Sequence, residues 1–197
     1  MKPIEDFPEK DRQRIRYVLT DIDDTLTIDG RLPAAVFVAM ERLLDAGIQT
    51  IPITGRPAGW CDHIDRMWPV AGVVGENGAF YFYYDAARHQ MVRRFWRNEE
   101  QRDEDRRKLT QLQHEILEQV PGAAVSADQS YREADLAIDF CEDVSPLAGP
   151  DVERIVEMFS ARGATAKISS IHVNGWFGTY DKLEMTRQLF EDLFAID

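Results

Sequence analysis

Residues 16–26 read RYVLTDIDDTL, in which a short apolar run passes directly into an acidic cluster. The run at residues 16–20 predicts a buried strand, and the cluster predicts a polar loop at the end of that strand. Asp21 and Asp23 stand two residues apart in this loop, so both carboxylates can face one cavity if the chain turns there. This stretch therefore predicts both a core strand and a candidate site.

The segments that follow alternate between helical and strand patterns. The predicted elements are, in order, a helix at residues 30–47, a strand ending at the turn of residues 54–57, a helix at residues 58–67 and a strand at residues 70–74. This order predicts a parallel sheet with right-handed crossovers. Ligands of such sheets bind beyond the carboxyl ends of the strands, where the turns DIDDT, TGR and GENG all fall.

Paired carboxylates at a strand end suit a magnesium site, because this ion prefers oxygen ligands and bridges to phosphate. A carboxylate neutralised by the metal can attack phosphorus, and its neighbour can carry a proton to the leaving oxygen. Two alternatives exist for Asp21 and Asp23 taken alone, a calcium-binding loop and a solvated acidic turn.

Two further segments carry candidate groups. Thr54 and Gly55 offer a hydroxyl and backbone N–H groups before a helix, which suits a phosphate, and Arg56 can add a bidentate contact. An ordinary capping turn is the alternative there. Lys182 begins the last predicted helix, where a cation opposes the helix dipole. This conflict indicates a functional demand, and a solvent-exposed lysine is the alternative.

The pattern changes after the third strand, where residues 79–96 predict a hairpin. We expect a core of residues 1–83, an inserted α/β domain of residues 84–172, and a return to the core in residues 173–197. The elements predicted within the insertion are a helix at 99–119, strands at 123–126 and 135–140, a helix at 150–161, and strands at 164–168 and 170–174. The amphipathic helix from Lys182 has one apolar side, made of Thr186, Leu189, Phe190, Leu193 and Phe194.

The composition restricts the class of protein. The 197 residues carry a net charge of −12, so nonspecific binding to nucleic acid or to an anionic membrane is not expected. An anionic substrate would need a locally positive site or a bound cation. No apolar run reaches the length of about 18 residues expected of a membrane span, and the N-terminus lacks the apolar core of a signal peptide. We expect a soluble, cytoplasmic protein whose Cys61 and Cys141 are free, buried thiols.

Together, the strand before DIDDTL, the ITGRP turn, the GENGA turn and the late TYDK resemble the motifs of the haloacid-dehalogenase-like hydrolases. The similarity is to the IIB-type branch, which includes Cof-like, sucrose-phosphatase-like and mannosyl-3-phosphoglycerate-phosphatase-like proteins. It spans most of the chain. It implies a Rossmann-like parallel-sheet core with an α/β cap inserted after the third core strand.

The resemblance also implies a role for each matching residue. Asp21 would be the nucleophile that forms an aspartyl-phosphate, Asp23 the general acid–base, and Lys182 the group that holds nucleophile and phosphate together. Mg²⁺ would be ligated by the Asp21 carboxylate and the Asp23 backbone carbonyl. The remaining site residues would be Thr54, Gly55 and Arg56 at the phosphoryl group, and Asn77 with Glu76 beneath the cap.

One motif of the family has no counterpart in these 197 residues, the GDxxND-like loop that completes the metal site. Without the strands that carry it, the strand at residues 16–20 is expected to be an exposed edge. Apolar edges invite association, so a homo-oligomer formed through this edge is one expected state. Three explanations stay open, namely a truncated chain, completion by a partner subunit, and catalytic impairment.

The primary functional hypothesis is a Mg²⁺-dependent phosphatase that acts on a small phosphorylated metabolite such as a sugar phosphate. The alternative is a catalytically impaired or truncated relative that binds a phosphorylated ligand or a partner without turnover. A phosphotransferase or mutase is a third possibility. His172, Asn174 and Trp176 lie where the predicted cap rejoins the core, so they could touch the substrate, although core packing is the alternative.

Overall fold

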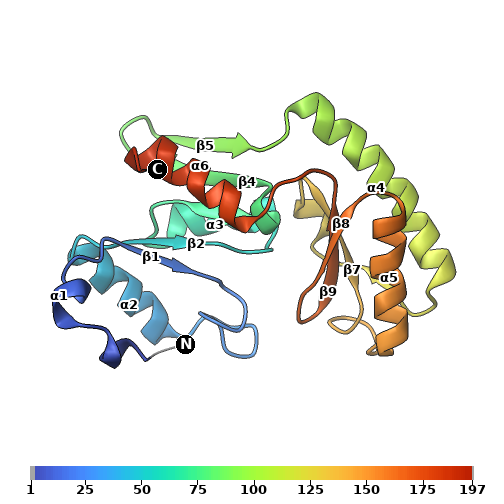
Figure 1. The fold of residues 1–197 in the computed structure, drawn as a ribbon, viewed down its shortest axis with the longest axis horizontal. Coiled ribbons are helices and arrows are strands. Elements are labelled where there is room, and N and C mark those ends of the chain that lie inside the picture. Colours follow the sequence, from blue (N-terminus) through green and yellow to red (C-terminus); the bar gives the residue numbers. More distant parts are fainter. Residues whose placement is uncertain (1–2, 197) are drawn as a thin grey trace.

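The chain folds into two α/β halves that lie side by side, a core and a cap (Figure 1). The computed structural model describes residues 3–196. Both ends of this range belong to the core, and the cap is made from the middle of the chain. The predicted fold class, a parallel-stranded core with an inserted α/β cap, is confirmed.

The core contains both short 3₁₀ helices and longer elements. Its first elements are η1 (Ile4–Asp6), α1 (Glu9–Arg12), β1 (Tyr17–Thr20), α2 (Ala34–Asp45), β2 (Gln49–Pro52) and α3 (Ala58–Met67). Its later elements are β3 (Val73–Gly75), η2 (Glu76–Gly78), β4 (Phe80–Asp85), β5 (Gln90–Phe95) and, after the cap, α6 (Lys182–Phe194).

The core strands follow the order β1-β2-β3-β4-β5. β1 and β2 are parallel, and an isolated parallel bridge between Ile53 and Val74 joins β2 to β3. β4 and β5 continue the layer as antiparallel strands. The carboxyl ends of β1, β2 and β3 therefore point the same way, as the sequence predicts, and the three polar turns meet at one edge.

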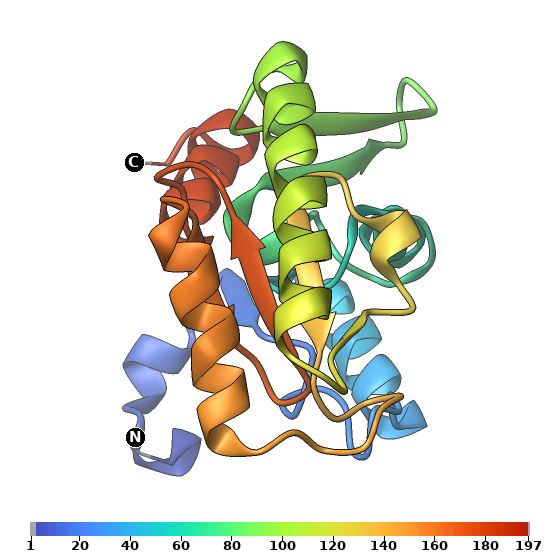
Figure 2. The ribbon, with the colours of Figure 1, turned by 90° about the vertical axis from the view of Figure 1, so that its right-hand side faces the viewer.

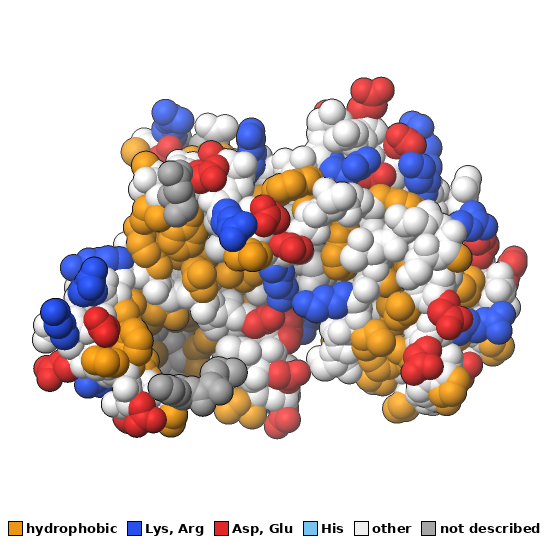
Figure 3. All heavy atoms as spheres, in the orientation of Figure 1, with side chains coloured by type: hydrophobic (Ala, Val, Ile, Leu, Met, Phe, Trp, Pro, Cys, Tyr) orange, Lys and Arg blue, Asp and Glu red, His pale blue; other side chains and the backbone are white. Residues whose placement is uncertain are grey.

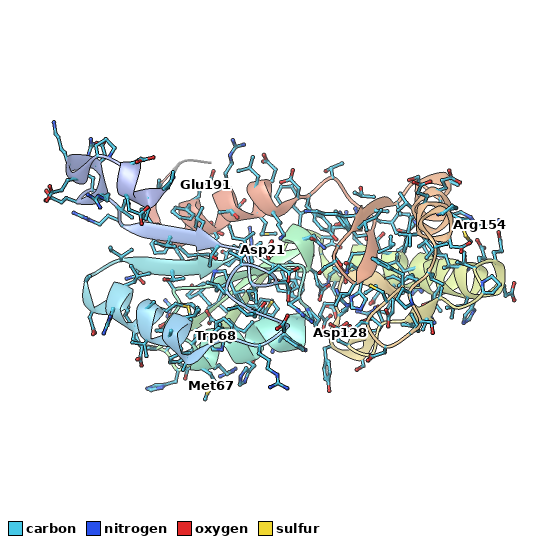
Figure 4. The ribbon with its side chains drawn as sticks, turned by 90° about the horizontal axis from the view of Figure 1, so that it is seen from below. Asp21, Met67, Trp68, Asp128, Arg154 and Glu191 are labelled. Atoms are coloured by element: carbon cyan, nitrogen blue, oxygen red, sulfur yellow. The ribbon has the colours of Figure 1, made fainter. Side chains whose placement is uncertain are left out.

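The two faces of the core sheet are covered by different helices. Figure 4 shows α6 on one side of the sheet, with α2 and α3 on the other. Alternation along β4 explains this division, because Phe80 and Phe82 pack with Cys61 of α3, whereas Tyr81 packs with Leu189 of α6. The Tyr81 hydroxyl also donates a hydrogen bond of 2.6 Å to an Asp192 carboxylate oxygen, which ties α6 to the sheet.

The cap is a four-stranded antiparallel sheet with two helices on its outer face, as Figure 2 shows. Its elements are α4 (Glu99–Gln119), β6 (Ala124–Val125), η3 (Gln129–Tyr131), β7 (Asp135–Asp139), α5 (Gly149–Ala161), β8 (Thr165–Ile168) and β9 (His172–Trp176). The strand order is β6-β7-β9-β8. α4 begins at a capping box in which the Asn98 side chain accepts the Gln101 N–H and the Gln101 side chain accepts the Asn98 N–H.

Strand pairing places the cap between α4 and β9, which differs from the predicted boundaries at 84 and 172. The hairpin of β4 and β5 belongs to the core, because Phe82 pairs with Val73 of β3. β9 belongs to the cap, because it pairs with β7 on one side and β8 on the other. The sequence of a short apolar strand does not indicate which sheet it joins. The difference between the predicted and the observed boundaries therefore arises from long-range strand pairing.

The open edge of β1 agrees with the expectation from the sequence. Within residues 3–196, β1 pairs only with β2, and Leu19 of β1 is 48% exposed. Figure 3 shows hydrophobic side chains over the neighbouring part of the core, between β1 and α6. Cys61 and Cys141 are both free, but Cys61 alone is buried, and Cys141 is partly exposed. None of the helices in the described range is long and apolar enough to cross a membrane.

Candidate functional site

A cavity of about 220 Å³ lies between the core and the cap, at the edge where the three polar turns meet. Figure 4 labels Asp21 near the middle of the molecule, at the end of β1. Predicted site residues that line the cavity from the core side are Asp21, Asp23, Gly55, Arg56, Asn77 and Lys182. The structure thus brings together six of the predicted site residues, whereas Thr54 and Glu76 do not line the cavity.

The loop after β1 turns sharply around Ile22. The Ile22 carbonyl accepts the N–H groups of Leu26 and Thr27, and its side chain is buried. Asp24 takes a left-handed conformation with φ of 56°. Because Ile22 points inward between them, Asp21 and Asp23 both line the cavity. This is the local reason why a two-residue spacing puts both carboxylates in one site.

Lys182 and Asp21 form an ion pair, although they stand 161 residues apart in the sequence. The Lys182 ammonium donates to Asp21 Oδ2 at 2.6 Å, and the Ile22 N–H donates to Asp21 Oδ1 at 2.8 Å. Both carboxylate oxygens of Asp21 are therefore oriented. The side chains of Lys182 and Asp21 stay 25% and 44% exposed, so a ligand in the cavity can reach both.

Gly78 explains how Lys182 comes close to the loops of the core. A side chain at Gly78 would meet the Asp181 carbonyl oxygen at 2.1 Å, so only glycine permits this approach. Gly78 also has a φ of 106°, a conformation that favours glycine. Asp181 then caps α6, accepting the Glu184 N–H at 2.8 Å. The GENG turn thus positions the last helix and its first residue.

Arg56 pairs with Asp23 in this structure. Its Nη2 lies 2.7 Å from Asp23 Oδ1, and its Nε donates to both carboxylate oxygens at 3.1 Å. The guanidinium also lies 4.5 Å from the ring centre of Trp60. The contact of Arg56 with a phosphate remains a prediction, and the contact with Asp23 was not foreseen.

Thr54 is fully buried and does not line the cavity. Its hydroxyl oxygen accepts the Arg56 N–H at 3.0 Å, and its carbonyl accepts the Asn77 N–H at 3.1 Å. Thr54 thus shapes the turn that presents Gly55, while Gly55 itself packs against the Asn77 side chain. The role of Thr54 as a phosphate ligand remains a prediction.

Glu76 joins the core to the cap from a fully buried position. Its carboxylate accepts four backbone N–H groups, one from the start of α3 and three from the cap, and these donors belong to Ala58, Glu133, Ala134 and Asp135. Burial, followed by the nearby Asp135 carboxylate, raises the pKa of Glu76 to about 8, and Arg132 opposes that rise. Glu76 lies beneath the cap as predicted, but it does not line the cavity.

Arg132 is the second part of this junction and was missed at the sequence level. Its side chain is 2% exposed and pairs with Asp135 at 3.0 Å and Asp128 at 2.9 Å. It also donates to the carbonyl of Gly55, a residue of the turn predicted to bind a phosphate, at 3.2 Å. The two carboxylates raise the pKa of Arg132 above its usual value, although burial acts in the opposite direction.

The cap side of the cavity is formed by Arg132, β8, β9 and the turn between the two strands. His172 and Asn174 line the cavity and are buried, whereas Trp176 does not line it and stacks on Tyr180. Asn174 donates to Asp135 at 3.1 Å, and His172 Nε2 lies 2.9 Å from a Glu142 carboxylate oxygen.

The Asp21 carboxylate and the Asp23 backbone carbonyl are oxygen ligands of the kind that magnesium prefers. Magnesium typically takes one or two carboxylates, with water and phosphate completing its shell. The Asp21 carboxylate faces the cavity, and no hydrogen bond from within residues 3–196 reaches the Asp23 carbonyl. Within the same residues, no three His, Cys, Asp or Glu side chains gather as a metal-binding group.

No protein-family model and no curated protein matches this sequence. Solved structures do match it. A haloacid dehalogenase-like hydrolase from Bacteroides thetaiotaomicron has a TM-score of 0.63 at 14% identity, over 91% of this chain and 77% of that chain. A subclass IIB sugar phosphatase of the haloacid dehalogenase (HAD) superfamily has a TM-score of 0.60 at 11% identity, over 92% of this chain and 77% of that chain.

This chain has a HAD IIB-like fold. The sucrose-phosphatase from Synechocystis sp. PCC6803, in complex with sucrose and phosphate, also matches, at a TM-score of 0.61 and 15% identity, over 92% of this chain and 71% of that chain. The similarity covers nearly the whole chain, including the cap. The predicted resemblance to the HAD hydrolases is thereby confirmed at the level of the fold.

Proposed function

We propose that this HAD-like chain is a Mg²⁺-dependent phosphatase for a small phosphorylated metabolite, with Asp21 as its nucleophile. The contact that carries the proposal is the 2.6 Å ion pair between Lys182 and Asp21 at the cavity. A lysine at this point neutralises the carboxylate that approaches an anionic phosphate, which removes the main electrostatic barrier to attack. Low-identity structural relatives described as phosphatases support the reaction class.

The reaction takes two steps. An Asp21 oxygen attacks phosphorus while the bond to the leaving alcohol breaks, and Asp23, as the general acid, gives a proton to the leaving oxygen. Water then attacks phosphorus of the aspartyl-phosphate, Asp23 takes a proton from it, and inorganic phosphate leaves. Bound magnesium, held by the Asp21 carboxylate and the Asp23 carbonyl, would supply charge neutralisation at the phosphoryl oxygens.

Phosphate release from a panel of phosphomonoesters, with Mg²⁺ and with EDTA, tests this proposal. The panel should include hexose phosphates, a disaccharide phosphate, phosphorylated hydroxy acids and p-nitrophenyl phosphate. We expect release from at least one member, and we expect EDTA to abolish it. No release from any member, or equal release in EDTA, would contradict the proposal.

Binding of a phosphorylated ligand without turnover is the second candidate. The pairing of Asp23 with Arg56 favours it, because a carboxylate held by a guanidinium is not free to deliver a proton. Calorimetry with inorganic phosphate distinguishes the two candidates when it is combined with the panel. Phosphate binding with no release across the panel would favour this second candidate.

A further inference from the structure

The two sides of the cavity differ in charge. The core side contributes three carboxylates, those of Asp21, Asp23 and Asp24. The cap side contributes no carboxylate among the residues that line the cavity, and it presents instead the cation-bearing and donor side chains of Arg132, Lys167, Ser169, Ser170, His172 and Asn174. Figure 3 shows basic side chains gathered at the junction of the two halves.

Most charged groups around the cavity already have partners. Lys182 pairs with Asp21, Arg56 pairs with Asp23, and Arg132 is buried against Asp135. Lys167 differs from these, because its ammonium makes no hydrogen bond or ion pair to any residue of the described range 3–196. It is also exposed, so its charge is available to a ligand.

Strand geometry directs Lys167 toward the cavity. Lys167 of β8 pairs directly with Asn174 of β9, so the two side chains share one face of the cap sheet. Asn174 and His172 lie on that face two residues apart, and both line the cavity. Val173, between them, packs instead in the cluster beneath α4 and α5. The alternation therefore assigns Lys167 to the side that faces the core.

The turn that follows Lys167 adds donors to the same end of the cavity. Ser169 is occupied locally, because its hydroxyl oxygen accepts the His172 N–H at 2.9 Å and its O–H donates to the His172 carbonyl at 3.0 Å. Ser170 also lines the cavity, and within residues 3–196 its hydroxyl makes no hydrogen bond. An ammonium and a hydroxyl thus face the cavity at an end that no carboxylate lines.

We propose that the cap end of the cavity, through Lys167 with Ser170, binds a second anionic group of the substrate. The substrate would then be a phosphorylated metabolite with a carboxylate or a second phosphate at the end remote from the reacting phosphate. The inference rests on the proposed function and narrows its substrate class. A chain of net charge −12 needs such a local cation to hold a second anion.

A matched pair of probes tests the proposal, because 3-phosphoglycerate and glycerol 3-phosphate differ in carrying a carboxylate or a hydroxymethyl group. We expect kcat/KM for 3-phosphoglycerate to exceed that for glycerol 3-phosphate about tenfold or more. Lys167→Gln should lower kcat/KM for 3-phosphoglycerate about tenfold, through a higher KM. It should leave kcat/KM for glycerol 3-phosphate within twofold of its original value. Lys108→Gln, on the outer helix α4, is the control and should change neither value.

The second arm of the test compares fructose 1,6-bisphosphate with fructose 6-phosphate. It shows whether the second anionic group that is bound is a phosphate or a carboxylate. Equal losses on both members of each pair in Lys167→Gln, or no loss at all, would overturn the inference while leaving phosphatase activity in place. Calorimetry in an Asp21→Asn background keeps the test independent of turnover. Equal affinities for both members of each pair there would overturn it as well.

Discussion

The chain contains two sets of ion pairs that differ in exposure. One set lies on the core side of the cavity, which we call its floor, and the other lies at the junction of core and cap. At the floor, Lys182 and Asp21 are 25% and 44% exposed. At the junction, Arg132 and Asp135 are 2% and 0% exposed. The distances are similar, at 2.6 Å and 3.0 Å, so exposure is the main difference between the two pairs.

This difference separates groups that can act on a ligand from groups that hold the halves together. A partly exposed pair loses little when a ligand replaces one partner, because exposed pairs contribute about 0–1 kcal/mol. A buried pair cannot exchange partners in this way, since a lone buried charge costs several kcal/mol. We therefore expect substitutions at the floor to change activity and substitutions at the junction to change stability.

Arg132→Met should give the largest effect and should act on stability. It leaves the Asp128 and Asp135 carboxylates in place with no cation, and breaking a buried pair in this way costs about 3–5 kcal/mol. Urea unfolding measures the loss. The control is Arg106→Met, at an exposed arginine of α4, which should cost under about 0.5 kcal/mol. Similar losses in the two variants would break the distinction between buried and exposed pairs.

Lys182→Met should show the opposite pattern. We expect phosphatase activity to fall about 10²–10³-fold, because the charge that stabilises the attacking carboxylate and the phosphate is removed. Stability should change by about 1 kcal/mol or less, since the pair is partly exposed. Arg187→Met, on the exposed side of the same helix, is the control for activity. A large fall in the free energy of unfolding without loss of activity would contradict the assignment.

The pH dependence of the free energy of unfolding should show the titration of Glu76 at the junction. Its pKa is raised to about 8 by burial, so between pH 4.5 and 8 the folded chain binds more protons than the unfolded chain. Stability should therefore fall as pH rises through this window. Glu76→Gln removes the titration and should flatten the curve. Parallel melting-temperature profiles from pH 5 to 8.5 in both proteins would contradict this expectation.

The sequence predicted the floor of the cavity well, because that floor is built from local rules. Asp21 and Gly55 each follow a parallel strand, and parallel strands bring their carboxyl ends to one edge. Lys182 could be predicted as a site residue because a cation at a helix N-terminus conflicts with the helix dipole. Its approach to Asp21 depends on Gly78, whose role in the late contact has no local sequence signal.

The junction and the cap side of the cavity could not be predicted in the same way. Residues 128–135 read DQSYREAD, a charge pattern that is typical of a solvated loop. The Arg132 side chain is buried in a segment whose backbone is bound by Glu76, more than fifty residues earlier in the chain. Lys167 likewise faces the cavity through the register of β8 with β9, which short apolar runs do not specify.

The most direct test of the account is phosphate release by Asp21→Asn compared with the unchanged protein and with Asp29→Asn. Asp29 lies in the same loop, does not line the cavity and has a φ of 49°, which asparagine tolerates. With Mg²⁺ and the best substrate of the panel, we expect Asp21→Asn to lose at least about 10³-fold in kcat and Asp29→Asn to stay within twofold. Substantial turnover by Asp21→Asn would contradict the assignment of Asp21 as the nucleophile.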